Sequence, residues 1–142
     1  MDRLTIPYVG MTPTVNHAGD AGNDLRANLG YPLTIQPGEI AMVDLDLRLA
    51  IPEGYVGLEF PRSGLGTKGI TLANAVGVID SGYRGPVKAA LVNLSVEPFT
   101  VYPGDRVCQL VIVPFAEVEW EPADSLPDSE RGERGYGSSG VM

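Results

Sequence analysis

The chain has 142 residues, 44% of them hydrophobic, which fits one compact domain with its own core. Its formal net charge of −8 argues against a nucleic-acid-binding surface, which needs many cations to replace counterions. The sequence has neither a signal peptide nor an apolar run of the roughly 20 residues that a membrane helix needs, so we expect a cytoplasmic protein without membrane contacts.

Cysteine and histidine are too rare for several kinds of active site. Cys108 is the single cysteine, which excludes an internal disulfide and a zinc site built on cysteines. His17 is the single histidine, so a Ser-His-Asp triad would have to be built on it. If the protein is a hydrolase, a carboxylate is therefore the expected base.

Glycine and proline recur about every ten residues and separate short segments rich in Val, Ile, Leu and Tyr, a rhythm typical of an all-β sandwich or barrel. The segment "MVDLDLRLAI", residues 42–51, alternates strictly between apolar and polar residues. This alternation predicts one strand with a buried face. That face carries Val43, Leu45, Leu47, Leu49 and Ile51.

Four more strands are predicted downstream, and "PGE", "PEG" and "PGD" are expected turns. A single helical turn is expected near residues 64–68. The predicted strands are Tyr55–Phe60, Val87–Leu94, Phe99–Tyr102 and Arg106–Pro114. Because the last of these is apolar on both faces, it needs a second covering layer, which another subunit would supply.

Three polar positions in these segments suggest anion or metal binding, and each also has a plain structural explanation. Asp24 could cap a turn or hold water around a magnesium ion. Residues 62–64, "RSG", combine a guanidinium, a hydroxyl and an unhindered amide that suit phosphate oxygens, or they form a turn with a solvated arginine. Gln109 lies in an apolar strand, where an unpartnered amide costs about 1–3 kcal/mol, so it must leave the core face or meet polar groups.

The stretch "VGVIDSGYRG" places an acid and an aromatic ring at one tight turn. Asp80 ends an apolar run, so we expect a strand to deliver it to the mouth of a site. Alternatively, Asp80 is an Asx-turn residue and Tyr83 packs against the core. Together the two residues suggest a pocket with a base on one wall and a ring on the other.

From residue 121 onward the chain becomes acidic and then rich in glycine and serine. Such a segment cannot bury enough apolar surface to order itself, so it is either a flexible tail or an arm that closes over a ligand. Arg131, Arg134 and Tyr136 favour an arm that covers an anion, since a spacer needs no arginines beside an aromatic ring.

Five stretches in this order resemble the motifs of the trimeric dUTPase family, which cleaves dUTP to dUMP and pyrophosphate, and they span nearly the whole chain. They are "AGNDLRA" (21–27), "PRSGLGTKG" (61–69), "NAVGVIDSGYRG" (74–85), "GDRVCQLV" (104–111) and "RGERGYGSSG" (131–140). The resemblance implies a distorted jelly-roll subunit over residues 1–120, a homotrimer, and a flexible arm over residues 121–142. That arm would complete an active site formed by two other subunits.

The resemblance also implies roles for individual residues. Asp80 matches the acid that activates the attacking water, and Tyr83 matches the ring that excludes a ribose 2′-OH. The hairpin backbone would read uracil, whose donor and acceptor pattern cytosine reverses. Magnesium would chelate the phosphates and meet Asp24 through water. The residues that match substrate-binding positions are Arg62, Ser63, Gly64, Asn74, Tyr83, Gln109, Arg131 and Tyr136.

Three departures and two alternatives accompany this resemblance. The interval between the second and third motifs is about one residue shorter than in the family, so Lys68 is given no role. Cys108 stands where Ala is common, and Tyr136 replaces a frequent Phe. A dCTP deaminase on the same fold would need a further acid near cytosine C4, and "KAALVN" offers no clear one. A regulatory protein that uses dUTP as a signal is the other alternative.

Overall fold

The structure is a computed structural model in which residues 3–137 and 140 are described. These residues form short strands and one helical turn, α1, over Ser63–Gly66. The strands are β1 (Tyr8–Gly10), β2 (Asn23–Arg26), β3 (Leu33–Ile35), β4 (Ile40–Asp44), β5 (Leu47–Leu49), β6 (Tyr55–Phe60), β7 (Ile70–Leu72), β8 (Gly77–Ile79), β9 (Lys88–Asn93), β10 (Phe99–Val101) and β11 (Arg106–Pro114). The predicted all-β fold is confirmed.

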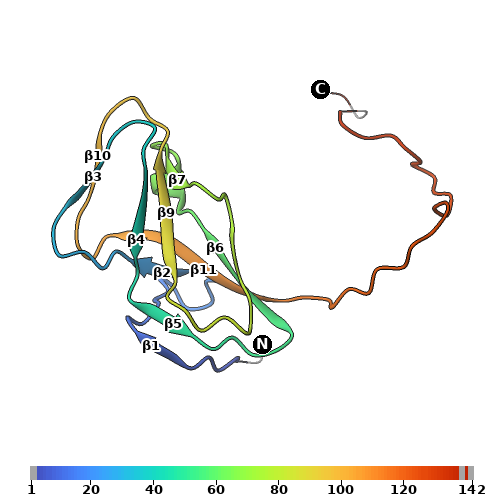
Figure 1. Ribbon diagram of the computed structural model, residues 1–142, viewed down its shortest axis with the longest axis horizontal. Coiled ribbons are helices and arrows are strands. Elements are labelled where there is room, and N and C mark those ends of the chain that lie inside the picture. The colour runs from blue at the N-terminus through green and yellow to red at the C-terminus, as the bar shows by residue number, and fades with distance from the viewer. Residues whose placement is uncertain (1–2, 138–139, 141–142) are drawn as a thin grey trace.

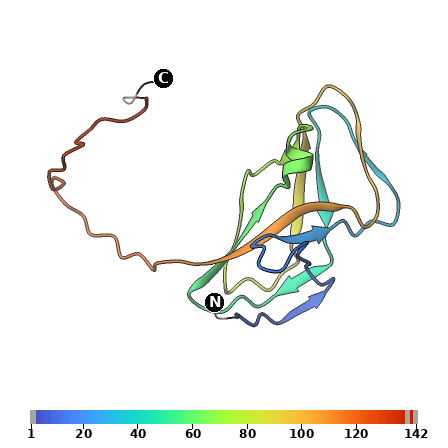
Figure 2. The ribbon, with the colours of Figure 1, turned by 180° about the vertical axis from the view of Figure 1, so that it is seen from behind.

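The strands pair in antiparallel ladders that enclose one core. The largest sheet has the order β2-β11-β6-β8, a second has the order β4-β9-β7, and two strand pairs join β1 to β5 and β10 to β3. Figures 1 and 2 show these sheets wrapped into a barrel-like body. None of the described residues forms a helix long and apolar enough to cross a membrane.

The predicted single strand over residues 42–51 is wrong in one respect. The five apolar side chains of its inner face are all buried, as the alternation predicts. However, the chain changes partner within it, because β4 pairs with β9 whereas β5 pairs with β1. Asp46 lies at the break with φ of 48°, and its carbonyl accepts a hydrogen bond from the Met11 amide. A short polar residue tolerates this left-handed conformation, which redirects the strand.

The other sequence predictions agree closely with the structure. Strands β6 and β11 have the predicted bounds, while β9 and β10 lie within theirs. The helical turn begins at Ser63, one residue earlier than predicted, and ends at Gly66, two residues earlier than predicted. The turn glycines Gly38, Gly54 and Gly104 all have positive φ, which only glycine adopts without strain.

Strand β11 holds the centre of the large sheet, and its two faces differ in burial. Val107, Cys108 and Leu110 are buried, and Cys108 is the small core residue that the sequence suggests. Val111 and Val113 are only half-buried. The chain therefore covers one face of this doubly apolar strand and leaves the other partly open.

After Pro114 the chain leaves the body as an extended arm (Figure 1). The Phe115 amide donates to the Gly54 carbonyl at 3.1 Å, and beyond this point the arm runs away from the barrel in both views (Figures 1 and 2). Trp120 and Leu126 on this arm are 87% and 85% exposed. The arm therefore leaves these two large apolar side chains uncovered in a single chain.

Candidate active site

A hollow beside α1 contains the phosphate-binding candidates of the second and fourth motifs. This hollow, called here the helix pocket, has a volume of about 460 Å³. Strand β6 ends at its edge, so that Pro61 and Arg62 lead directly into α1, and Ser63 and Gly64 are exposed at the start of that turn. The pocket is lined by Phe60, Pro61, Arg62, Ser63, Gly66, Thr67 and Gln109.

Asp24 lies behind the helix pocket on β2, not in a turn, so the turn-cap interpretation is wrong. Its carboxylate is buried and bridges two arginines: Arg62 Nε donates to Oδ1 at 2.9 Å, and Arg106 Nη1 lies 3.5 Å from Oδ2. Because both guanidinium groups contact one buried carboxylate, removing either arginine would leave charge uncompensated. Arg62 is thus an ion-pair partner, not a solvated turn residue.

The half-buried side-chain amide of Gln109 forms a hydrogen bond with the backbone. Its Nε2 donates to the Pro61 carbonyl at 3.0 Å, which joins β11 to the loop before α1. The side chain lies over Gly22, where an added Cβ would approach Gln109 Oε1 to 2.1 Å. Gly22 is therefore needed for the position of this amide, and the second sequence alternative, that Gln109 meets polar groups, is confirmed.

A second hollow lies at the turn that follows β8 and contains Asp80. This hairpin pocket has a volume of about 310 Å³ and is lined by Tyr55, Val56, Leu58, Val78, Asp80, Ser81 and Phe115. Strand β8 ends at Ile79, so a strand delivers the exposed Asp80 to the pocket, as predicted. The Asp80 carbonyl accepts from the Tyr83 amide at 3.1 Å, which closes the tight turn.

Tyr83 is held against the same hairpin through its hydroxyl group. The hydroxyl donates to the Pro86 carbonyl at 2.9 Å, while the ring remains 46% exposed. An added Cβ on Gly85 would lie 2.5 Å from this hydroxyl, so Gly85 leaves the space that the ring needs. Tyr83 is therefore not a core residue, but it does not line the pocket that contains Asp80, so a single chain does not form the predicted pocket with the acid and the ring on its two walls.

The two pockets lie at opposite ends of β6 in a single chain. Gly57 pairs with Ile79, so Asp80 follows alongside Val56, whereas Arg62 comes six residues later. At about 3.3 Å per extended residue, Arg62 is roughly 20 Å along the chain from the position beside Asp80. One subunit therefore does not bring Asp80 and Tyr83 together with Arg62, Ser63, Gly64 and Gln109.

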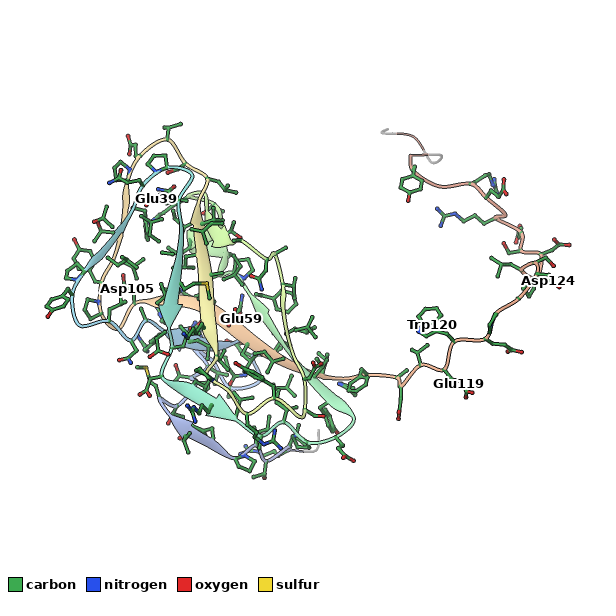
Figure 3. The ribbon with its side chains drawn as sticks, in the orientation of Figure 1. Glu39, Glu59, Asp105, Glu119, Trp120 and Asp124 are labelled. Carbon is green, nitrogen blue, oxygen red and sulfur yellow. The ribbon has the colours of Figure 1, made fainter. Side chains whose placement is uncertain are left out.

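The arm residues are also remote from both pockets. Arg131 Nε donates to the Arg134 carbonyl at 2.6 Å and Arg134 Nε donates to the Arg131 carbonyl at 3.0 Å, so these arginines bond within the arm. Tyr136 is fully exposed. Figure 3 shows the labelled arm residues Glu119, Trp120 and Asp124 well away from the body.

The comparisons with known proteins agree with one family throughout. The dUTPase family model matches residues 10–140. The chain belongs to the dUTPase family. It is 49% identical over 146 residues to the deoxyuridine 5′-triphosphate nucleotidohydrolase of Cutibacterium acnes, covering 99% of this chain and 95% of that protein.

Solved dUTPases share the fold as well. A mutant dUTPase of Staphylococcus bacteriophage 80alpha, determined with dUpNHpp, aligns with a TM-score of 0.82 and 30% identity over 96% of this chain and 99% of that one. A mutant dUTPase from phage phi11 of S. aureus, described as coordinating a structural Mg(II) ion, has a TM-score of 0.78 and 25% identity over 88% of this chain and 100% of that one.

Asn74 lines neither pocket of this dUTPase chain. It is exposed in the turn between β7 and β8, where its carbonyl accepts from the Val76 amide at 2.7 Å. The side-chain amide faces Gly77, because an added Cβ there would lie 3.5 Å from Asn74 Nδ2. Asn74 thus precedes β8 by three residues, whereas Asp80 follows that strand directly.

The sequence analysis missed Glu59, which is the most unusual acid in the body. Glu59 on β6 is 3% exposed, and burial raises the pKa of its carboxyl group to about 7. Burial also raises the pKa of the Cys108 thiol, with Glu59 and Asp24 adding to the effect, so this thiol stays neutral. The one available signal was alternation: Glu59 occupies an inward position two residues after the buried Gly57.

Proposed function

We propose that this protein hydrolyses dUTP to dUMP and pyrophosphate, which limits uracil in DNA and supplies dUMP for thymidylate synthesis. The observation that carries this proposal is the match of the dUTPase family over residues 10–140, which includes every stretch with a candidate site residue. A cytoplasmic location belongs to the same proposal and suits the free thiol of Cys108.

In the proposed mechanism, Asp80 acts as the general base. Its carboxylate accepts a proton from water as the water oxygen forms a bond to the α-phosphorus. The bond between that phosphorus and the oxygen bridging to the β-phosphate breaks, and pyrophosphate leaves. The exposed position of Asp80 after a rigid strand supports this role, since a base must reach a bound water without moving the backbone.

The remaining roles divide between the two pockets and the arm. Tyr83 lies against the deoxyribose, where a 2′-OH would collide with its ring, and Asn74 contacts the uracil edge. Arg62, Ser63, Gly64 and Gln109 bind the phosphate chain in the helix pocket. From the arm, Arg131 reaches the γ-phosphate and Tyr136 stacks over uracil.

The active site is proposed to form between the subunits of a homotrimer. The separation of Asp80 from Arg62 along β6 supports this, because the proposed base and the proposed phosphate contacts belong to different pockets of one chain. The half-open face of β11 and the exposed apolar side chains of the arm add support, since both surfaces need a partner. The division at residue 120 between a β domain and an arm over residues 121–142 is part of this proposal.

The residues around Asp24 fit a magnesium ion that arrives with the nucleotide. Each carboxylate oxygen of Asp24 has one arginine partner and retains a lone pair that can accept from a metal-bound water. Direct coordination would place the metal beside two guanidinium groups, so contact through water is expected. When bound, magnesium would neutralise phosphate charge and fix the α-phosphorus for in-line attack.

Pyrophosphate release from dUTP, dCTP, dTTP and UTP, with and without magnesium, tests the proposed activity. We expect rapid release from dUTP alone, dependent on magnesium. Ammonia release from dCTP would instead identify a deaminase, and no release from dUTP would refute the proposal. Light scattering should give a mass near three subunits, whereas an active monomer would exclude the shared site.

Mixed oligomers test whether the arm acts on another subunit. One variant carries Asp80→Asn, and the other ends after residue 130; each should be nearly inactive alone. Co-expressed chains should regain activity at about a quarter of the sites, because a truncated chain can supply Asp80 while its partner supplies the arm. Purified mixed oligomers without activity would show that base and arm must come from one chain.

A further inference from the structure

Glu59 is buried at a place where an acid is costly. Its side chain points into the body (Figure 3), and its Oε2 has no hydrogen-bond partner among residues 3–137 and 140. An unsatisfied buried polar group costs about 1–3 kcal/mol, and more when it is charged. Ile79 and Leu110 beside it belong to the hydrophobic core, so an apolar residue at position 59 would pack without this cost.

The neighbours of Glu59 connect this acid to the proposed uracil site. Glu59 pairs with Gly77 across the β6–β8 ladder. A Cβ added to Gly77 would lie 3.1 Å from Glu59 Cβ, 3.3 Å from Glu59 Oε1 and 3.5 Å from Asn74 Nδ2. The carboxyl group of Glu59 and the amide nitrogen of Asn74 therefore both lie over the same side of the Gly77 backbone.

These two groups are chemically complementary. The amide nitrogen of Asn74 has only donors, and Glu59 Oε1 has an acceptor lone pair whether the acid is neutral or ionised. An amide without such a partner can turn over and exchange its donor with its acceptor, which would invert the pattern offered to a base. An acceptor on one side of the amide nitrogen therefore selects one orientation.

We propose that Glu59 is a positioning residue that orients the side-chain amide of Asn74, directly or through one water, and so fixes the pattern this amide presents to uracil. The proposal rests on the proposed function of Asn74 as a contact of the uracil edge. It explains why the fold keeps a carboxyl group in its core one strand away from the nucleotide. Glu59 itself touches no substrate.

The enzyme assay compares Glu59→Leu with Glu59→Gln, which retains a carbonyl oxygen. For Glu59→Leu we expect KM for dUTP to rise about tenfold with kcat nearly unchanged, and the preference for dUTP over dCTP to fall by a similar factor. Glu59→Gln should stay close to wild type. Glu59→Met serves as a second apolar variant, and melting curves confirm that each variant is folded.

A double-mutant cycle separates positioning from general packing. In an Asn74→Ala background, Glu59→Leu should have no further effect on KM or base preference, since the amide it orients is gone. A full effect in that background would overturn the proposal. So would wild-type KM and base preference in both Glu59→Leu and Glu59→Met.

A second measurement does not depend on catalysis. The side-chain amide signals of Asn74 in ¹⁵N-labelled protein should shift in Glu59→Leu and stay in place in Glu59→Gln. Unchanged signals in Glu59→Leu would refute the positioning role even if the wild-type enzyme hydrolyses dUTP. Conversely, a wild-type protein inactive on dUTP would refute the proposed function while the amide signals still report on Glu59.

Discussion

The helix pocket is held by bonds between residues far apart in the chain, whereas the hairpin pocket is held by bonds within one turn. Asp24 is fixed by two arginines and Gln109 by the Pro61 carbonyl, so this pocket depends on residues from β2, β11 and α1. Asp80 and Tyr83 instead belong to one tight turn, closed by bonds between residues three apart. The first pocket needs the tertiary fold, and the second is largely a local structure.

This difference suits the two tasks proposed for the pockets. A triphosphate carries high charge, and converging cations held in a network bind it best. Discrimination among bases and sugars needs a rigid edge, which a hairpin backbone and one clamped ring supply. Substitutions in the two pockets should therefore produce different kinetic signatures.

The largest effect is expected for Asp80→Asn. Asn keeps the shape of the side chain but cannot accept the proton from water, so kcat should fall by about 10²–10⁴ while nucleotide affinity is retained. Steady-state kinetics and equilibrium binding of a non-hydrolysable dUTP analogue measure the two quantities. Asp46→Asn, at an exposed acid where Asn tolerates the positive φ, is the matched control. Near-normal turnover by Asp80→Asn would remove Asp80 as the base.

Gly22→Ala should disturb the helix pocket alone. The new Cβ would lie 2.1 Å from Gln109 Oε1, so the amide must leave the Pro61 carbonyl and its proposed phosphate contact. We expect kcat/KM to fall by about tenfold to a hundredfold for dUTP, with the ratio of dUTP to UTP hydrolysis unchanged. Gly30→Ala, where an added Cβ meets nothing within 4 Å, is the control. A changed sugar preference would contradict the separation of the two pockets.

Gly85→Ala should give the opposite signature. Its Cβ would meet the Tyr83 hydroxyl at 2.5 Å and displace the ring from the hairpin. The ratio of kcat/KM for dUTP to that for UTP should fall about tenfold. The KM for dUTP should change little, because the contacts to the phosphate chain are untouched. Tyr83→Phe, which keeps the ring but loses the bond to Pro86, should lie between wild type and Gly85→Ala. An unchanged ratio in Gly85→Ala would show that the ring position does not set sugar selectivity.

The sequence predicted the local pocket better than the tertiary one. Asp80 could be placed at a strand end and Tyr83 at its turn because both follow from neighbouring residues. The ion pairs of Asp24 join residues far apart in the chain, so no spacing predicts them, and the turn-cap interpretation failed for that reason. The break at Asp46 was hidden because the alternation continues through a change of strand partner.

The smallest expected effect concerns Glu59 and is measured as a change in the stability of the fold with pH. Because burial raises its pKa to about 7 from 4.5, the folded state binds a proton more tightly than the unfolded chain. The contribution of Glu59 to stability is therefore fully present below pH 4.5 and is lost as the pH rises through about 7. Cys108 is a titratable neighbour of Glu59 in the core, and burial raises the pKa of its thiol so that it stays neutral across this range.

Replacement by Leu removes this pH-dependent loss. The melting temperature of Glu59→Leu should exceed that of wild type by a few degrees at pH 8, and the difference should shrink toward pH 5, where the wild-type acid is protonated. Glu53→Leu, at an exposed acid of the body, is the matched control. A constant difference between Glu59→Leu and wild type across this range would mean that the acid is not desolvated. The face of Gly77 that it shares with Asn74 would then be open to water, so any contact between the two groups would run through water.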